Sequence, residues 1–360
     1  MAEKMKAQVF YEAEKMGMED VDVPKVSEMD VLVKVRNVGI CGSDISYYFG
    51  WSPLDTPSGK GPLILGHEFT GDVVEVGAIP KAKGLFKPGD RVVINPVQHC
   101  GACYNCAAGK THMCQNLSVI GVSTEGAFAQ YTSSLYTGLF KLPDNVSYEA
   151  GALIEPMACA VNGMNKLEIK SGHFVAVFGP GPIGLMMVQM AKNAFGAGKV
   201  ALIGTRDYRL ELGKKMGADY ILNMRDEKSP YYVKDVKEAI ADLTHGNLAD
   251  RVIVPTGSNE GFELAVEVGG NCSIIVHFGL PDGDAVFKIP ALNFHTMDKQ
   301  IRSAWLAPLV WPQTIRIIQE GLIDLESLVT HKAPLEDTVK TIDALKNRIG
   351  NPVKAEVVIE

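Results

Sequence analysis

The chain has 360 residues, with 35 Lys and Arg against 42 Asp and Glu, which gives a formal net charge of −7. Hydrophobic residues make up 46% and charged residues 21%, which is typical of a globular protein and excludes a disordered chain. The length is about twice that of a common domain and therefore predicts two lobes. The acidic balance argues against a nucleic-acid partner, because neutralising phosphates requires a basic face.

No targeting or membrane segment is expected. The first ten residues include charged side chains and lack an apolar stretch. The uncharged segment 171–191 is long enough for a membrane span, but Pro180 and Pro182 would break a lipid-exposed helix at its middle. We interpret it as a buried strand, a glycine turn and a buried helix, in a cytoplasmic protein with no membrane partner. The odd number of cysteines, seven, indicates reduced thiols and a metal rather than a disulfide scaffold.

The first half of the chain predicts short β-strands separated by Gly and Pro turns. β-branched runs bounded by turn residues lie at 31–38, 71–76 and 90–94. From about residue 170, apolar runs of strand length alternate with stretches of helical length, which predicts an α/β fold with a parallel, doubly wound sheet. The predicted strands there are 174–178, 200–203, 252–254 and 273–278, and the predicted helices are 183–195 and 210–216. In the tail we expect helices at 313–320 and 335–346, then a strand at 355–359 that returns to the first lobe.

Four of the seven cysteines lie close together in sequence, with the spacing Cys-x2-Cys-x2-Cys-x7-Cys. They are Cys100, Cys103, Cys106 and Cys114. Four thiolates at this spacing can enclose one tetrahedral zinc ion, which leaves no open position and therefore predicts a structural site. An iron–sulfur cluster is the alternative, but no Pro follows the fourth cysteine and no second cysteine cluster exists in the sequence.

A second set of potential ligands is spread more widely along the chain: Cys41, His67, Glu68 and Glu155. A thiolate, an imidazole and a carboxylate suit a catalytic zinc that keeps one position open for water or substrate. Spacing alone leaves the ordinary alternative open, in which a buried thiol and a His-Glu pair have no shared role.

A glycine motif, G-x-G-x-x-G, directly follows the predicted strand 174–178. Its residues are Gly179, Gly181 and Gly184, with Pro182 and Ile183 between the last two. Glycines allow a tight turn and a close approach of the backbone to a pyrophosphate, which binds at the N-terminus of the following helix. The motif therefore predicts a dinucleotide site, with a plain tight turn as the alternative.

The end of the next predicted strand bears on the choice of dinucleotide. An Asp or Glu there accepts a hydrogen bond from the 2′-hydroxyl of NAD, but this chain has Gly204, Thr205 and Arg206, with Arg209 close behind. A guanidinium pairs well with a 2′-phosphate, so we predict NADP(H) in preference to NAD(H). Asp207 leaves NAD(H) as an alternative cofactor, because a small shift of the loop could place its carboxylate on the ribose.

In this order the motifs resemble the zinc-dependent medium-chain dehydrogenase/reductase family, and within it the sorbitol (polyol) dehydrogenase-like branch. The resemblance spans nearly the whole chain. It rests on Gly39-Ile40-Cys41-Gly42-Ser43-Asp44, Gly66-His67-Glu68, Lys87-Pro88-Gly89-Asp90-Arg91-Val92, the four cysteines, Leu142-Pro143-Asp144, Gly151-Ala152-Leu153-Ile154-Glu155-Pro156 and the glycine turn. It implies a GroES-like β-rich catalytic domain at 1–161 and 303–360, with a Rossmann dinucleotide-binding domain at 162–302.

The resemblance also implies roles for the potential ligands. Cys41, His67 and Glu68 would surround the catalytic zinc, and Glu155 would be either the fourth ligand or the holder of a zinc-bound water. Asp44 would orient a ligand such as His67. Ser43 would accept the alcohol proton and pass it toward the cofactor ribose.

The chain departs from the family at Ser46, where many relatives carry a His that hands the alcohol proton to solvent. Ser46 could hold a water in that role, or the relay could end differently. Tyr47, Phe49 and Trp51 lie where substrate-pocket side chains are expected. The alternative is that these aromatic side chains only pack within the lobe.

The implied activity is the interconversion of a secondary alcohol of a polyol, sugar alcohol or cyclitol and its ketone, with NADP(H) and two zinc ions per chain. The same architecture could act on a simple secondary alcohol, a threonine-like amino alcohol or a polyol phosphate, with Lys60, Lys110 or Arg302 as the phosphate anchor. The alternative that is not an enzyme is a non-catalytic, zinc-stabilised binding protein. Relatives form dimers or tetramers through the edge of the Rossmann sheet, which we place at residues 285–289.

Overall fold

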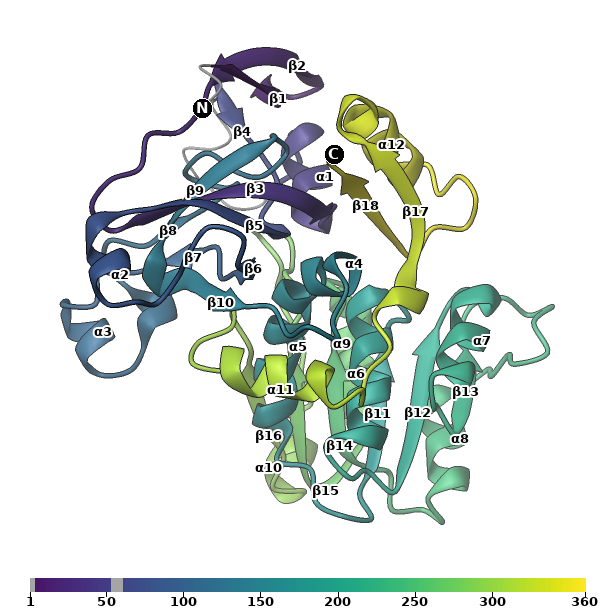
Figure 1. Ribbon diagram of the computed structural model, residues 1–360. Coiled ribbons are helices and arrows are strands. Elements are labelled where there is room, and N and C mark those ends of the chain that lie inside the picture. Colours follow the sequence, from purple (N-terminus) through teal and green to yellow (C-terminus); the bar gives the residue numbers. More distant parts are fainter. Residues whose placement is uncertain (1–3, 53–60) are drawn as a thin grey trace. The chain divides into compact units, whose positions relative to one another are not determined.

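The computed structural model describes residues 4–52 and 61–360, so Lys60 lies outside the described residues. The chain divides into two compact units, which we treat separately (Figure 1). Unit 1 comprises Met1–Pro156, Trp311–Gln319 and Leu325–Glu360, and unit 2 comprises Met157–Val310 and Glu320–Asp324. Unit 1 is therefore built from both ends of the chain. The domain limits expected from the sequence, at 161/162 and 302/303, stay a prediction.

Unit 1 is rich in β-structure. Its largest sheet has the strand order β10-β6-β5-β3-β18-β17, and β9 also pairs with β3. These strands are β3 (Asp30–Gly39), β5 (Glu68–Val76), β6 (Arg91–Ile94), β9 (Tyr131–Leu135), β10 (Leu139–Lys141), β17 (Val329–Pro334) and β18 (Lys354–Val358). Smaller sheets join β1 (Lys4–Glu12), β2 (Lys15–Asp22) and β4 (Leu63–Ile64), and also β7 (Val97–Gln98) and β8 (Ser118–Val119). The helices are α1 (Gly42–Tyr48), α2 (Ala78–Ala82), α3 (Tyr104–Ala107), α4 (Tyr148–Ala152), α11 (Trp311–Gln319) and α12 (Thr338–Lys346), while α5 (Ile154–Leu167) begins in unit 1 and ends in unit 2.

The closing strand β18 completes the sheet of unit 1. It pairs with β3 in antiparallel register, and β3 pairs in turn with β5 (Figure 1). Glu356 therefore faces Gly39, and Gly39 faces Glu68, in one row across three strands. The return of the tail to the first lobe, expected from the apolar run near the C-terminus, is confirmed.

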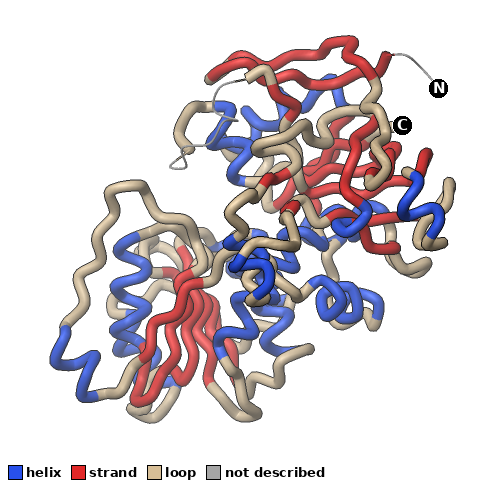
Figure 2. Tube along the Cα trace, turned by 90° about the vertical axis from the view of Figure 1, so that its left-hand side faces the viewer, coloured by secondary structure: helices blue, strands red, loops and turns tan. Residues whose placement is uncertain are grey.

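Unit 2 contains a six-stranded parallel sheet with the order β13-β12-β11-β14-β15-β16. The strands are β11 (Phe174–Phe178), β12 (Lys199–Gly204), β13 (Tyr220–Asn223), β14 (Ala249–Val254), β15 (Gly269–His277) and β16 (Gln300–Ser303). The helices are α6 (Pro182–Asn193), α7 (Asp207–Lys215), α8 (Val236–Leu243), α9 (Asn259–Val268) and α10 (Ala291–Thr296). Figure 2 shows helices on both faces of this sheet, as the largely buried strands β11, β12 and β14 require.

Segment 171–191 folds as β11, a glycine turn and α6, as interpreted from the sequence. Within residues 4–52 and 61–360, no helix has both the length and the apolar character that a membrane crossing requires.

The predicted sheet edge at 285–289 is wrong. These residues form no strand, and the outer strand on that side is β16. The cause is that Phe287 and Ile289 pack onto the core of unit 2, where the Phe287 ring lies 4.5 Å from that of Phe262. Because these two side chains pack on the core, segment 285–289 is held there and does not join the sheet.

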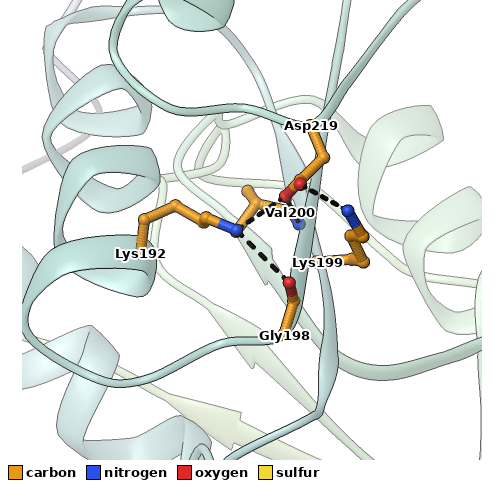
Figure 3. A network of polar contacts seen from close by, with 5 residues as sticks. All are labelled: Lys192, Gly198, Lys199, Val200 and Asp219. Carbon is orange, nitrogen blue, oxygen red and sulfur yellow. Dashed lines mark hydrogen bonds and ion pairs between the residues drawn. The ribbon is translucent and has the colours of Figure 1, made fainter.

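Asp219 links the start of β12 to α6 (Figure 3). Its carboxylate accepts hydrogen bonds from Lys192 Nζ (3.0 Å), Lys199 Nζ (3.0 Å) and the backbone N–H of Val200 (2.8 Å). Burial alone would raise the pKa of Asp219, but these hydrogen bonds and the lysine charge hold that pKa below its ordinary value. The network fixes the helix that follows the glycine turn against the sheet.

Candidate metal and cofactor sites

The four cysteines of the 100–114 segment converge on one point. Their sulfur atoms all lie within 4.8 Å of one another. Sγ of Cys103 lies 3.5 Å from that of Cys106 and 3.9 Å from that of Cys114, and Sγ of Cys114 lies 3.5 Å from that of Cys100. In a tetrahedral site with zinc–sulfur bonds of about 2.3 Å, neighbouring sulfurs are about 3.8 Å apart. The spacing therefore fits one zinc ion.

The electrostatics of this cysteine cluster are uneven. Backbone N–H groups of Ala102 and Cys103, together with the neighbouring thiol of Cys114, lower the pKa of Cys100 to about 6. Desolvation, followed by the neighbouring thiols, raises the pKa of Cys106 to about 12. Backbone N–H groups also point at the sulfur of Cys114, from Cys100 (3.4 Å) and Asn116 (3.3 Å). Backbone N–H groups of the loop therefore stabilise thiolate at Cys100 and point at the sulfur of Cys114, as in an anion-binding backbone turn.

Cys41, His67 and Glu68 form the second group of potential ligands. Cys41 is the N-cap of α1, and His67 immediately precedes β5, which begins at Glu68. One ligand atom from each residue lies within 4.8 Å of the other two. His67 and Glu68 are buried and Cys41 is partly buried. This donor set, a thiolate with an imidazole and a carboxylate, suits zinc.

Asp44 is fully buried behind this group. Its Oδ2 accepts a hydrogen bond from the backbone N–H of Cys41 (2.8 Å), and its Oδ1 lies 3.6 Å from Nδ1 of His67. Burial alone would lower the pKa of His67, but the charges of Asp44 and of Cys41 raise it well above its ordinary value. Asp44 therefore holds the backbone of Cys41 by a hydrogen bond and places a carboxylate beside Nδ1 of His67, at an ion-pair distance.

Lys354 is a residue of this group that sequence reasoning missed. Its ammonium forms an ion pair with Oε2 of Glu68 and donates a hydrogen bond to the carbonyl of Ile40 (2.9 Å). The two side chains are almost completely buried, at 5% and 1% exposure. Gly39 leaves room for the pair, because a Cβ there would lie 2.2 Å from Glu68 Oε2. The signal in the sequence is a Lys and a Glu at alternate positions of an otherwise apolar final strand.

The remaining residues predicted around the metal are placed as follows. Glu155 is buried in the first turn of α5, but the described group of ligand atoms within 4.8 Å does not include its carboxylate. Ser43 lies in the first turn of α1 and is partly buried. The hydroxyl of Ser46 donates a hydrogen bond to the carbonyl of Gly42 (3.0 Å), one turn earlier in the same helix. Its proton is therefore engaged by the helix itself.

Of the three aromatic residues near this site, two belong to the core. Tyr47 and Phe49 are buried in the hydrophobic cluster of unit 1, while Trp51 is 58% exposed. The rings of Phe49 and Trp51 stack at 4.9 Å, and Nζ of Lys346 lies 3.6 Å from the Phe49 centroid. Packing therefore accounts for Tyr47 and Phe49.

The glycine motif forms the turn between β11 and α6. Gly179 adopts a φ of +113°, which favours glycine. A Cβ at Gly184 would lie 1.9 Å from the carbonyl oxygen of Gly179, so the helix can approach the strand only without a side chain there. Gly181 is the N-cap of α6, which starts with Pro182 and Ile183, and a Cβ on Gly181 would meet no atom within 4 Å. There is therefore free space beside the N-cap of α6, the end of a helix that favours an anion.

The end of β12 touches this turn. A Cβ at Gly204 would lie 2.5 Å from Cδ of Pro180. Thr205 and Arg206 follow, with Arg206 as the extended N-cap of α7, and Nε of Arg209 donates to the hydroxyl of Tyr208 (2.8 Å). Thr205, Arg206 and Arg209 are all partly buried. Arg206 and Arg209 thus lie at the start of the helix that directly follows β12.

The anchors considered for a polyol phosphate are less suitable. Arg302 Nη1 is engaged by Glu168 Oε1 (2.6 Å) and by the carbonyl of Lys166 (2.8 Å), and Lys110 is exposed on the cysteine loop. The Arg302 guanidinium is therefore already engaged within the protein, and Lys110 is an exposed charge.

Two family models match this chain. Residues 27–144 match the family model of the alcohol dehydrogenase GroES-like domain, and residues 182–320 match that of the zinc-binding dehydrogenases. The chain is 33% identical to a sorbitol dehydrogenase of Bacillus subtilis (strain 168) over 93% of this chain and 92% of that protein. The chain belongs to the zinc-dependent medium-chain dehydrogenase/reductase family. It is also 32% identical to an L-threonine 3-dehydrogenase of Bacillus velezensis, over 96% of this chain and 97% of the relative.

A solved structure agrees with this membership. A zinc-binding dehydrogenase from Sinorhizobium meliloti 1021, solved bound to NADP, has a TM-score of 0.88 and 27% identity, covering 99% of this chain and 100% of that one. The fold class predicted from the sequence, a Rossmann sheet with a GroES-like domain, is confirmed, as is membership of the sorbitol dehydrogenase-like branch. The protein is an enzyme of the zinc-dependent alcohol dehydrogenase family.

Proposed function

We propose that this enzyme interconverts a secondary alcohol of a polyol, sugar alcohol or cyclitol and the corresponding ketone, using NADP(H). The observation that carries the proposal is the convergence of Cys41, His67 and Glu68, with Asp44 behind them, in a member of a zinc dehydrogenase family. Three protein ligands leave one position for a substrate oxygen, which is the arrangement of a catalytic zinc site.

Two separate metal sites follow from the donor sets. We propose that Cys100, Cys103, Cys106 and Cys114 hold a structural zinc, because four thiolates complete its coordination. We propose that Cys41, His67 and Glu68 hold the catalytic zinc, with Nε2 of His67 as ligand, since Nδ1 faces Asp44. In this proposal Glu155 acts through a water or moves to the metal as a fourth ligand.

Each residue around the catalytic site has its own role in the proposed reaction. When bound, zinc supplies Lewis-acid stabilisation of an alkoxide, and the nicotinamide supplies the hydride acceptor. Ser43 accepts the alcohol proton at Oγ and passes it toward the cofactor ribose. Asp44 keeps His67 and the backbone of Cys41 in place, and Lys354 fixes one oxygen of Glu68. Ser46, whose hydroxyl proton is bonded to Gly42, takes no direct part in the relay.

The proposed preference for NADP(H) rests on the end of β12. Gly204 packs on the glycine turn at Pro180, and the next residues are Thr205 and Arg206 instead of an acidic residue. We propose that Arg206 and Arg209 pair with the 2′-phosphate, while Gly179, Gly181 and Gly184 admit the pyrophosphate at the start of α6.

A substrate panel tests the proposed activity. Zinc-loaded enzyme is assayed with NADP+ against polyols, cyclitols, simple secondary alcohols, threonine and a polyol phosphate, following absorbance of the reduced nicotinamide. We expect the highest kcat/KM with a polyol or cyclitol. Threonine as the best substrate would instead favour the specificity of the Bacillus velezensis relative. The absence of turnover on every compound, in either direction, would favour a non-catalytic zinc-stabilised binding protein.

We also propose a cytoplasmic location and a homodimer or homotetramer in solution. The odd number of cysteines supports the location, as does the lack of a disulfide in the part of the chain described. Light scattering coupled to gel filtration tests the assembly, and a monomeric mass would contradict it.

A further inference from the structure

Asp207 is the acidic residue closest in sequence to the predicted 2′-phosphate site, and two neighbours bind its carboxylate. It is the first residue of α7, three positions beyond Gly204. Its Oδ1 accepts a hydrogen bond from Nδ2 of Asn223 (2.7 Å) and another from Oγ of Ser229 (2.7 Å). Asn223 is 1% exposed and Ser229 is 8% exposed, so both donors are buried. Asp207 is itself partly buried, but an oxygen that accepts two short hydrogen bonds from buried donors gives its carboxylate little freedom to turn elsewhere.

The two donors lie on the outer side of β12. Asn223 ends β13, where it faces Gly204 in the parallel register, and Ser229 belongs to the segment between β13 and α8. The glycine turn follows β11, which is the neighbour of β12 on its other side. The carboxylate of Asp207 is therefore drawn toward the sheet edge at β13, away from the side on which the glycine turn would hold a dinucleotide.

The donor Asn223 is itself held in place. Its Oδ1 accepts the backbone N–H groups of Arg225 and Asp226, each at 3.0 Å. Its backbone N–H donates to the carbonyl of Tyr231 (2.8 Å). The Tyr231 hydroxyl in turn donates to Glu211 of α7 (3.3 Å). The orientation of the Asn223 amide is therefore set by the loop, so it presents its N–H group, not its oxygen, to Asp207.

We propose that Asn223 and Ser229 are specificity-determining residues, which hold the Asp207 carboxylate away from the adenosine ribose so that the site accepts a 2′-phosphate. The inference rests on the proposed use of NADP(H). A released Asp207 would repel the 2′-phosphate of NADP and would accept a hydrogen bond from the 2′-hydroxyl of NAD. Asn223 and Ser229 thus act through Asp207 and need no contact with the cofactor.

The test compares the dissociation constants of NADPH and NADH, measured by the fluorescence of the bound reduced nicotinamide, so it does not depend on knowing the substrate. In the Asn223→Ala/Ser229→Ala variant we expect the preference for NADPH to fall about tenfold, the size of one added charge–charge repulsion at short range. Adding Asp207→Asn to this variant should restore the preference to within about threefold of the original. Asp207→Asn in the otherwise unchanged chain should alter it by less than about threefold, because the carboxylate is already turned away.

Two further variants keep the test decisive. Tyr231→Phe removes the contact of the loop with Glu211 but leaves Asp207 bound, and it should not change the preference. Ser229→Ala alone leaves the side-chain hydrogen bonds of Asn223 in place and removes the hydrogen bonds of Ser229 Oγ to Asp207 and from the backbone N–H of Tyr231 (3.1 Å). It should shift the preference toward NADH by about threefold, which gives a result even if the double variant does not fold.

The outcomes separate the two levels of the proposal. An unaltered enzyme that binds NADH more tightly than NADPH would overturn the proposed cofactor and this inference with it. A clear preference for NADPH that persists in Ser229→Ala and in the double variant would overturn the role of Asn223 and Ser229 and leave the proposed cofactor standing. A preference that is lost in the double variant but not restored by Asp207→Asn would also overturn this inference, because the carboxylate would not be the cause.

Discussion

Replacing Lys354 by Met tests whether the buried charges behind the catalytic site depend on one another. The substitution removes the ammonium from beside Glu68 and keeps a side chain of similar length. The Lys354 side chain is 5% exposed and that of Glu68 is 1% exposed, so water cannot replace the lost partner.

The expected cost follows from this burial. Removing one partner of a buried ion pair destabilises a protein by about 3–5 kcal/mol, because the other charge remains uncompensated. A matched control lies on the neighbouring strand, where Lys332 pairs with Glu149 at 2.6 Å but is 50% exposed. For Lys332→Met we expect a loss of about 0–1 kcal/mol.

The assay is urea unfolding of both variants and the unaltered enzyme, after metal removal by a chelator and again after addition of zinc. In the metal-free state Lys354→Met should lose several times more unfolding free energy than Lys332→Met. With zinc the loss for Lys354→Met should shrink, because a cation bound by Glu68 compensates its charge. Equal losses for the two variants without metal, or a loss for Lys354→Met that zinc leaves unchanged, would refute the reasoning.

Three other changes have defined outcomes. Gly39→Ala would place a Cβ 2.2 Å from Glu68 Oε2, so we expect a loss of about 1–3 kcal/mol in urea unfolding; unchanged stability would show that Glu68 has room to move. Arg206→Ala should weaken NADPH binding about 10- to 100-fold in a fluorescence titration and leave NADH nearly unaffected, whereas an equal loss for both would reject the 2′-phosphate contact. Asp219→Asn should cost about 1–3 kcal/mol at neutral pH. Because folding lowers the pKa of Asp219, its contribution is present above the ordinary carboxyl pKa and is lost as the pH falls through the folded value, so the gap from the unaltered enzyme should close in acid; a constant gap would contradict this.

Much of the fold could be predicted from local pattern. The apolar run 174–178 coincides with β11, and the uncharged stretch after the glycine turn gives α6, because strands and helices buried on all sides need continuous apolar sequence. The edge at 285–289 could not be judged in this way. Its alternation resembles a strand, but Phe287 and Ile289 use their side chains to pack on the core.

The candidate sites, too, could be predicted only in part from the sequence. Residue type and spacing are enough to single out the four cysteines and the Cys41, His67 and Glu68 group, since chemistry limits what can bind a metal. Spacing did not identify Lys354 or the Asn223–Ser229 pair. Strand pairing brings Lys354 to Glu68 from the other end of the chain, and loop geometry brings Asn223 and Ser229 to Asp207. Distances of this kind exist only in the folded chain.

The zinc content of the purified enzyme, measured per chain by elemental analysis, tests the central claim most directly. Residues 4–52 and 61–360 contain two separate groups of ligands, so the unaltered enzyme should hold two zinc ions. Cys41→Ser and Cys103→Ser should each retain one, and only Cys41→Ser should lose turnover while keeping its fold. One zinc ion or none in the unaltered enzyme, or two in Cys41→Ser, would contradict the account.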